Sequence, residues 1–316
     1  MSRTHHRRRM HWGRLALLLV FLAAAVYAAY HCLVQAPQQS NQPVQNEEEL
    51  TPEEEALRSH LERKPDFYTI LVSGVDDHNG GSDTNILVAV DAANDTIYGV
   101  SIPRDTKAII DGKAHKINYA YNSGGMSLMA DVITEQLGLP VDYTVQVDLQ
   151  GFVAIVDAIG GVEFDVPIDM HYEDPYQDLY IHINKGLQRL DGEDALKVVR
   201  FREGYATQDI GRMNTQQAFL KAAAKQTLTP ANLDKIDDFV KIFQSYVETD
   251  LTLGNLAWLG KEAIRMGADA ISFSTLPGEW KKPYIYLDQE AVLTLVNEHL
   301  NPYVEDRVAE DLNIPS

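Results

Sequence analysis

Between residues 70 and 106 the chain carries three short apolar runs, each rich in Ile and Val and bounded by Gly, Asn, Asp or Pro. Runs of this length and composition predict three successive strands, the last two joined as a hairpin. Further strands are predicted at residues 141–149, 162–166 and 271–276. Polar and charged residues gather at the ends of the first three runs.

Helical periodicity separates the predicted strands. Helices are expected at residues 52–63, 127–137, 152–159, 192–199, 230–247, 256–266 and 288–300. A further long helix is expected to continue through residues 215–227. Asp191, Asn255 and Asp288 precede three of them and are expected to cap them. Strands that alternate with helices favour an α/β fold whose mixed sheet is covered on both faces.

The first 34 residues differ from the rest. Residues 2–14 carry five arginines and three histidines, and residues 15–34 are almost wholly apolar, about the 20 residues that a membrane-spanning helix needs. The positive-inside rule places the basic tail in the cytoplasm and the remainder outside. A cleaved signal peptide would also place the domain outside, but the apolar run is long and no clean small-x-small cleavage site ends it, so we favour the uncleaved anchor.

These patterns give a domain plan. We expect a cytoplasmic tail at 1–14, a single transmembrane anchor at 15–34, a stalk and short helix at 35–63, and an extracytoplasmic domain at 64–316 that ends in a helical extension. Residues 35–50 are rich in Gln, Asn, Pro and Glu and lack an apolar face, which is typical of a flexible stalk.

Charge narrows the function. All 46 acidic residues and 22 of the 27 basic residues follow residue 34, which gives this part a net charge of −24. Phosphate backbones are bound by basic surfaces, so a general nucleic-acid binder is excluded. Cys32 is the only cysteine, which excludes an internal disulfide framework and a cysteine-rich metal site.

Acidic and basic side chains mark the ends of the first three predicted strands. Asp76 follows the first strand, Asp83 lies at the start of the second, and Arg104 and Asp105 follow the third. Together they would suit Mg²⁺ with a phosphate group, because Mg²⁺ prefers carboxylate oxygens and arginine binds phosphate in a bidentate manner. The alternative is structural: such Asp residues often form turns, and such Arg-Asp pairs often form ordinary salt bridges.

More phosphate-capable donors follow. Lys116 lies in a basic, aromatic segment, where it either contacts phosphate or only solubilises a loop. Arg200 and Arg202 follow the helix at 192–199, and Arg212 and Gln216 share one face at the start of the next helix. Trp280, beside two lysines, either meets a glycan or membrane surface or packs at a solvated turn.

Five motifs in order carry a resemblance. They are Gly-Val-Asp…Ser-Asp-Thr…Ser-Ile-Pro-Arg-Asp-Thr (74–106), Lys-Ile-Asn-x-Ala-Tyr (116–121), Asp-Ala-Ile-Gly-Gly-Val-Glu-Phe-Asp-Val-Pro (157–167), Leu-Asp-Gly-Glu-Asp-Ala-Leu-Lys-Val-Val-Arg-Phe-Arg (190–202) and Asp-Ile-Gly-Arg-x-x-x-Gln (209–216). Over roughly residues 66 to 225 the chain resembles the LytR-CpsA-Psr family.

The resemblance implies a three-layer α/β/α domain on the outer face of the cell membrane. Such proteins attach a polyprenyl-pyrophosphate-linked glycopolymer, such as teichoic acid or capsule, to a peptidoglycan hydroxyl with the help of Mg²⁺. The implied residues are Asp76 and Asp83 for the metal, Arg104, Arg200, Arg202 and Arg212 for the pyrophosphate, Lys116 and Gln216 as further contacts, and Asp105 and Asp209 to orient the arginines.

The chain departs from the family pattern at two positions. Gly81 and Thr215 stand where many members carry arginine, and each lost guanidinium would cost about 1.5 to 3 kcal/mol of charge-assisted hydrogen bonding. Two alternatives to a transferase therefore stay open. One is a protein that binds or senses the lipid-linked glycan without transferring it, and the other is a polyprenyl-pyrophosphate phosphatase.

Overall fold

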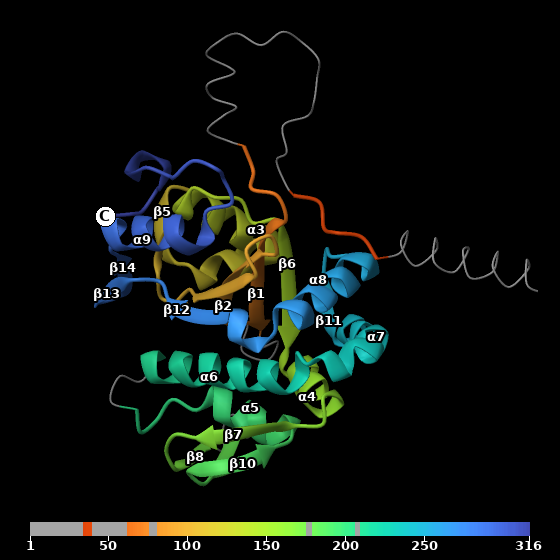
Figure 1. Cartoon of the computed structure of the whole chain (residues 1–316). Helices are drawn as coiled ribbons and strands as arrows, with labels where there is room; N and C mark the ends of the chain where they lie inside the picture. Colours follow the sequence, from red (N-terminus) through yellow and green to blue (C-terminus); the bar gives the residue numbers. More distant parts are fainter. Residues whose placement is uncertain (1–33, 40–61, 76–80, 175–178, 206–208) are drawn as a thin grey trace, which may run out of the picture.

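The computed structural model describes residues 34–39, 62–75, 81–174, 179–205 and 209–316, and a six-stranded sheet forms its centre (Figure 1). The strand order is β11-β6-β1-β2-β3-β12, with bounds Val247–Thr249, Tyr143–Asp148, Phe67–Val75, Ser82–Asp91, Thr96–Ser101 and Ile271–Thr275. β6 is parallel to β1 and β12 is parallel to β3, whereas the other neighbours are antiparallel. The sheet is therefore mixed, as predicted.

Helices cover both faces of the sheet. They are α3 (Asn118–Leu137), α4 (Leu149–Ala158), α7 (Ile236–Tyr246), α8 (Leu253–Met266) and α9 (Gln289–Leu295), the last continuing as a π-helical turn, η3 (Val296–Leu300). Because successive strand residues face opposite sides, Leu71 packs with α3 and α9 whereas Ile70 packs with α7 and α8. The result is the expected arrangement of helix, sheet and helix.

A smaller lobe with its own core lies beyond one end of the sheet strands (Figure 1). It contains α5 (Gly192–Arg200), α6 (Asp209–Thr227) and two strand pairs, β7 (Val162–Val166) with β10 (Gly186–Leu190) and β8 (Met170–Asp174) with β9 (Leu179–Ile183). Phe219 of α6 is fully buried in this core, where its ring contacts Phe152 and Phe164. The other side of α6 faces the sheet, where Gln217 donates to Ser101 of β3 and to the Ser274 carbonyl of β12.

Two expected caps are confirmed and one is wrong. Asp191 accepts a hydrogen bond from the Asp194 backbone N–H, and Asp288 accepts one from Ala291. The cap of α8 is Thr252 rather than Asn255, because the helix begins three residues earlier than expected and the two side chains form a reciprocal capping box.

Three other elements differ from expectation. α3 begins at Asn118 rather than near residue 127, since the chain continues helically on both sides of a kink at Gly124 and Gly125. Residues 107–116 form a hairpin, β4 (Lys107–Ile110) with β5 (Lys113–Lys116), instead of a loop. Trp280 lies in β13 (Gly278–Lys281), which pairs with β14 (Tyr284–Leu287), and is not in a turn.

The residues after the expected anchor contact the domain. The Gln35 carbonyl accepts a hydrogen bond from Asn255, and the Gln38 backbone exchanges two hydrogen bonds of 2.7 Å with the Tyr143 hydroxyl. Among the described residues, no helix has the length and hydrophobicity to cross a membrane. The predicted anchor at 15–34, except Val34, and the predicted helix at 52–63, except its last two residues, lie outside the described residues.

Candidate functional site

The polar residues at the strand ends meet at one edge of the sheet. β1 ends at Val75 opposite Ser82 at the start of β2, and β3 ends at Ser101 opposite Ile86. Because β2 runs antiparallel to both neighbours, the end of β1, the start of β2 and the end of β3 fall on the same edge. The sequence-based prediction of a shared rim is therefore confirmed for the described residues.

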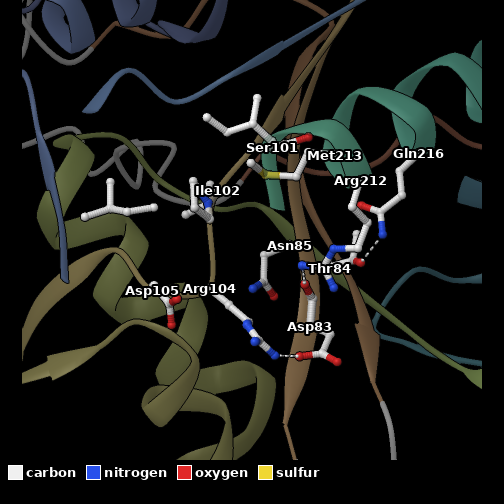
Figure 2. A pocket seen from close by; sticks show the side chains of 13 residues that line it. Asp83, Thr84, Asn85, Ser101, Ile102, Arg104, Asp105, Arg212, Met213 and Gln216 are labelled. Atoms are coloured by element: carbon white, nitrogen blue, oxygen red, sulfur yellow. Dashed lines mark hydrogen bonds and ion pairs between the residues drawn. The ribbon is translucent and has the colours of Figure 1, made fainter. Parts of the chain in front are cut away.

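Asp83 is the centre of a guanidinium cluster that joins three elements. Its Oδ1 lies 2.5 Å from Arg104 Nη1, which follows β3, and its Oδ2 lies 3.5 Å from Arg202 Nη2, which follows α5. Arg212 of α6 donates from Nη2 to the Asp83 backbone carbonyl at 3.4 Å. Figure 2 shows Arg104 and Arg212 approaching Asp83 from different sides.

The three arginines lie at different depths. Arg212 is only 4% exposed, whereas the side chains of Arg104 and Arg202 are 27% and 37% exposed. Burying a charged group is unfavourable unless opposite charge or hydrogen bonds compensate it. Among the described residues, three guanidiniums approach Asp83, two at its carboxylate and one at its backbone carbonyl. Guanidiniums grouped in this way suit an anionic ligand such as phosphate.

A pocket open to solvent, with an empty volume of about 430 Å³, lies against this cluster. Asp83, Arg104, Asp105, Arg212 and Gln216 all line it, together with Thr84, Asn85, Ser101, Ile102, Pro103, Ile210, Met213 and Ile285. Five residues singled out from the sequence thus share one cavity.

Gln216 holds three elements together at the pocket. Its Nε2 donates to Thr84 Oγ1 of β2 at 3.1 Å and to the Val199 carbonyl of α5 at 2.9 Å. Gln216 therefore fixes α6 against the sheet and the end of α5. This positions Arg202, which follows α5, relative to Arg212.

Gln217, which sequence reasoning missed, does the same at the neighbouring strands. Its Nε2 lies 2.9 Å from Ser101 Oγ, 3.0 Å from the Ser274 carbonyl and 3.3 Å from Thr275 Oγ1. The only signal in the sequence was the pair of adjacent glutamines at the start of a helix. Adjacent helix residues point in different directions, so Gln216 binds β2 while Gln217 binds the neighbouring strands β3 and β12.

We expect Gln217→Ala to destabilise the fold by about 1 to 3 kcal/mol, because the buried acceptors that it serves would lose their donor. Chemical denaturation of the purified protein measures this change. Gln146→Ala is the matched control, since Gln146 bonds only an exposed Glu248 carboxylate at 3.1 Å and should change stability little. Equal stability of the two variants would contradict a positioning role for Gln217.

The remaining predicted residues are placed as follows. Lys116 Nζ lies 2.7 Å from Asp105 Oδ1, so the Asp105 carboxylate pairs with this lysine. Arg200 is the last residue of α5 and is partly exposed, and the pocket lining does not include it. Asp209 begins α6, but its side chain, like the whole of Asp76, lies outside the described residues.

At one of the two departures from the family pattern, the structure shows what replaces arginine. Thr215 is buried, donates to the Gly211 carbonyl at 3.0 Å and accepts from the Tyr205 hydroxyl at 2.7 Å. Burial raises the pKa of Tyr205, whereas its hydrogen bond with Thr215 lowers it. The Tyr205 ring lies against Gly211, where any Cβ would clash with it.

Metal-binding capacity rests on few donors. In the described parts of the chain, no three His, Cys, Asp or Glu side chains gather closely enough to hold a metal ion. Asp83 does line the pocket, and the neighbouring Ser82 Oγ is buried with no hydrogen-bond partner among the described residues. Mg²⁺ commonly uses one or two carboxylates and completes its shell with water and substrate phosphate. The donor set fits such a site.

Comparison with known proteins gives consistent results. The model of the LytR_cpsA_psr family matches residues 29–303. The chain is 32% identical over 245 residues to the polyisoprenyl-teichoic acid–peptidoglycan teichoic acid transferase TagU of Bacillus cereus, covering 76% of this chain and 77% of that protein. It is 30% identical over 250 residues to TagU of Bacillus subtilis, covering 77% and 79%. The crystal structure of B. subtilis TagV superposes with a TM-score of 0.66 at 28% identity, covering 76% of this chain and 98% of that one.

Proposed function

Because the chain belongs to the LytR-CpsA-Psr family, we propose that it transfers a polyprenyl-pyrophosphate-linked anionic glycopolymer, of the teichoic acid or capsule type, to peptidoglycan. The transferase names of its relatives support the reaction class. The observation that carries the proposal is the convergence of Arg104, Arg202 and Arg212 on Asp83 at one pocket. A diphosphate is the anion that such a cluster suits best, since each guanidinium offers a bidentate fork to phosphate oxygens.

The proposed reaction is a phosphoryl transfer. An acceptor sugar hydroxyl gives its proton to a carboxylate at the pocket, its oxygen forms a bond to the phosphorus that carries the glycan, and the bond from that phosphorus to the bridging oxygen breaks. Polyprenyl phosphate leaves. Such reactions depend on positioning and charge stabilisation more than on covalent participation by the protein.

The depths of the arginines suggest their roles. Arg212, the most buried of the three arginines and held in place by α6, binds one phosphate of the diphosphate. Arg104 and Arg202, nearer the solvent, contact the oxygens on which charge develops. Asp83 holds these two guanidiniums in place before the substrate arrives. Arg200, the last residue of α5, is proposed as a further contact from the family resemblance.

Mg²⁺, when bound, would neutralise phosphate charge and act as a Lewis acid. Asp83 is the described residue that would hold it, with Asp76, the residue after β1, as the second ligand implied by the family resemblance. Lys116 and Asp105, which form an ion pair at the pocket, and Asp209 at the start of α6 remain proposed supporting residues.

We expect removal of divalent cations to lower transfer by at least about tenfold, since the metal supplies part of the transition-state charge stabilisation. Transfer by the purified full chain would be measured before and after treatment with EDTA and after addition of excess Mg²⁺. The expected result is loss followed by recovery. Unchanged transfer in EDTA would contradict a metal-assisted reaction.

The cellular location follows from the predicted anchor. We propose a single-pass membrane protein with its domain on the outer face, as the basic tail before the apolar segment favours. The contacts of Gln35 with α8 and of Gln38 with the start of β6 support an attachment near the end of the sheet that lies opposite the pocket.

The decisive assay separates transfer from hydrolysis and from binding alone. The full chain in detergent is supplied with a synthetic polyprenyl-pyrophosphate-linked oligosaccharide, labelled in the sugar, and with peptidoglycan. The proposal requires polyprenyl phosphate to be released and the label to become covalently attached to peptidoglycan. Label in solution would indicate a phosphatase, and affinity without release would indicate a binding protein.

A further inference from the structure

Trp280 has one of the most exposed large rings among the described residues. It lies in β13, all four residues of which are exposed, and 53% of its surface is accessible. Exposed apolar residues are common individually and need no explanation. The surroundings of this ring therefore decide whether it has a function.

The ring lies next to residues that line the pocket or pair with its lining. Trp280 is the cross-strand partner of Ile285, and directly paired residues project from the same face of a hairpin. Ile285 lines the pocket, and its backbone N–H donates to the Asp105 carbonyl at 2.9 Å. On the other side, Lys116 Nζ lies 5.9 Å from the centre of the Trp280 ring while it pairs with Asp105. Two independent contacts thus connect Trp280 to the rim.

The charges around the ring are mostly compensated. Lys116 pairs with Asp105 at 2.7 Å, and Lys281 pairs with Glu279 at 2.8 Å. Anionic membrane surfaces are recognised by clusters of about four to eight basic residues, which this hairpin does not provide. What it offers is a flat aromatic face bordered by polar groups. That combination suits a pyranose ring, whose axial C–H bonds form an apolar face and whose hydroxyls point to the sides.

We propose that Trp280, with Lys116 and Ile285 beside it, forms the acceptor subsite, on which a sugar ring of the peptidoglycan glycan strand stacks. The inference rests on the proposed function and deepens it. Arg104 and Arg212 line the pocket, and so does Ile285 of the β13–β14 hairpin, so a sugar held on this hairpin would present its hydroxyl to a diphosphate bound by the arginines. The saccharide stacks on the indole while its hydroxyls reach Lys116 and the ion pairs.

The test compares Trp280→Ala with Tyr246→Ala in the full chain. Tyr246 is similarly exposed, at 48%, but lies at the end of α7, on the opposite side of the molecule (Figure 1). We expect Trp280→Ala to raise the KM for peptidoglycan about tenfold while the KM for the lipid-linked donor stays unchanged, Trp280→Phe to recover part of the loss, and Tyr246→Ala to behave as wild type. A peptidoglycan KM that changes less than twofold in Trp280→Ala would overturn the proposal.

A binding measurement keeps this inference separate from the proposed function. Titration of wild type with N-acetylchitotetraose, a β-1,4-linked aminosugar oligomer, should show binding that Trp280→Ala abolishes, whether or not the chain transfers a glycopolymer. Phosphatidylglycerol vesicles are the second probe. Loss of vesicle binding in Trp280→Ala, with oligosaccharide binding intact, would overturn the proposal in favour of a membrane contact.

Discussion

Arg212→Ala is expected to reduce glycopolymer transfer by about 100- to 1,000-fold, the effect of removing one preorganised charge contact from an active site. Arg212 is 4% exposed and lines the pocket, so solvent screens its charge less than that of the more exposed arginines. Arg202, at 37% exposure, should matter less, and Arg202→Ala is expected to lose roughly tenfold. The effect of each arginine should therefore follow its burial.

Two variants control the Arg212 result. Arg212→Lys keeps the charge but loses the planar fork, so an intermediate rate is expected. Arg265→Ala removes an exposed arginine that pairs with Asp95 and Glu262 on α8, and it should transfer as wild type. Thermal unfolding shows whether Arg212→Ala is folded. A folded Arg212→Ala variant with near-normal transfer would remove this residue from the reaction.

Asp83→Asn is expected to lower kcat by about 100-fold without raising the KM for the lipid-linked donor. The substitution preserves shape but removes the negative charge that aligns Arg104 and Arg202 and that would hold Mg²⁺. The same charge repels phosphate, so its loss should not weaken donor binding. A lower kcat with an unchanged or lower KM separates an organising role from a simple binding role.

Asp95→Asn is the matched control for Asp83, because the Asp95 carboxylate also pairs with an arginine, Arg265, at 2.5 Å, but in the exposed turn between β2 and β3. Steady-state rates of donor consumption give both constants for each variant. The interpretation fails if Asp83→Asn retains its kcat, or if its donor KM rises while kcat is unchanged.

The polar rim of the sheet was predictable because each of its residues lies directly beside a strand in the sequence. The apolar runs defined β1, β2 and β3, and the residues directly after or before each run had to fall at strand ends. Asp191 was predictable for the same reason, since a cap and its helix are adjacent in sequence. Local patterns are therefore sufficient to place Asp83 and Arg104 at one edge of the sheet.

The features that were missed depend on distant partners. β13 has no alternating pattern, because all four of its residues are exposed, and it forms a strand by pairing with β14. Gln217 gained its role from strands 57 and 116 residues away. The ion pair of Lys116 with Asp105 also depends on how the β4–β5 hairpin folds back. Sequence periodicity carries no signal for such contacts.

Binding of a short polyprenyl diphosphate would show whether the arginines around Asp83 form a diphosphate site. Isothermal titration of the full chain with geranyl diphosphate would measure affinity for wild type, Arg104→Ala, Arg212→Ala and the Arg265→Ala control. If the guanidiniums around Asp83 form the diphosphate site, the first two variants should bind at least about tenfold more weakly, as expected for loss of a charge-assisted contact, and the control should bind normally. Equal affinity in all four proteins would contradict the account.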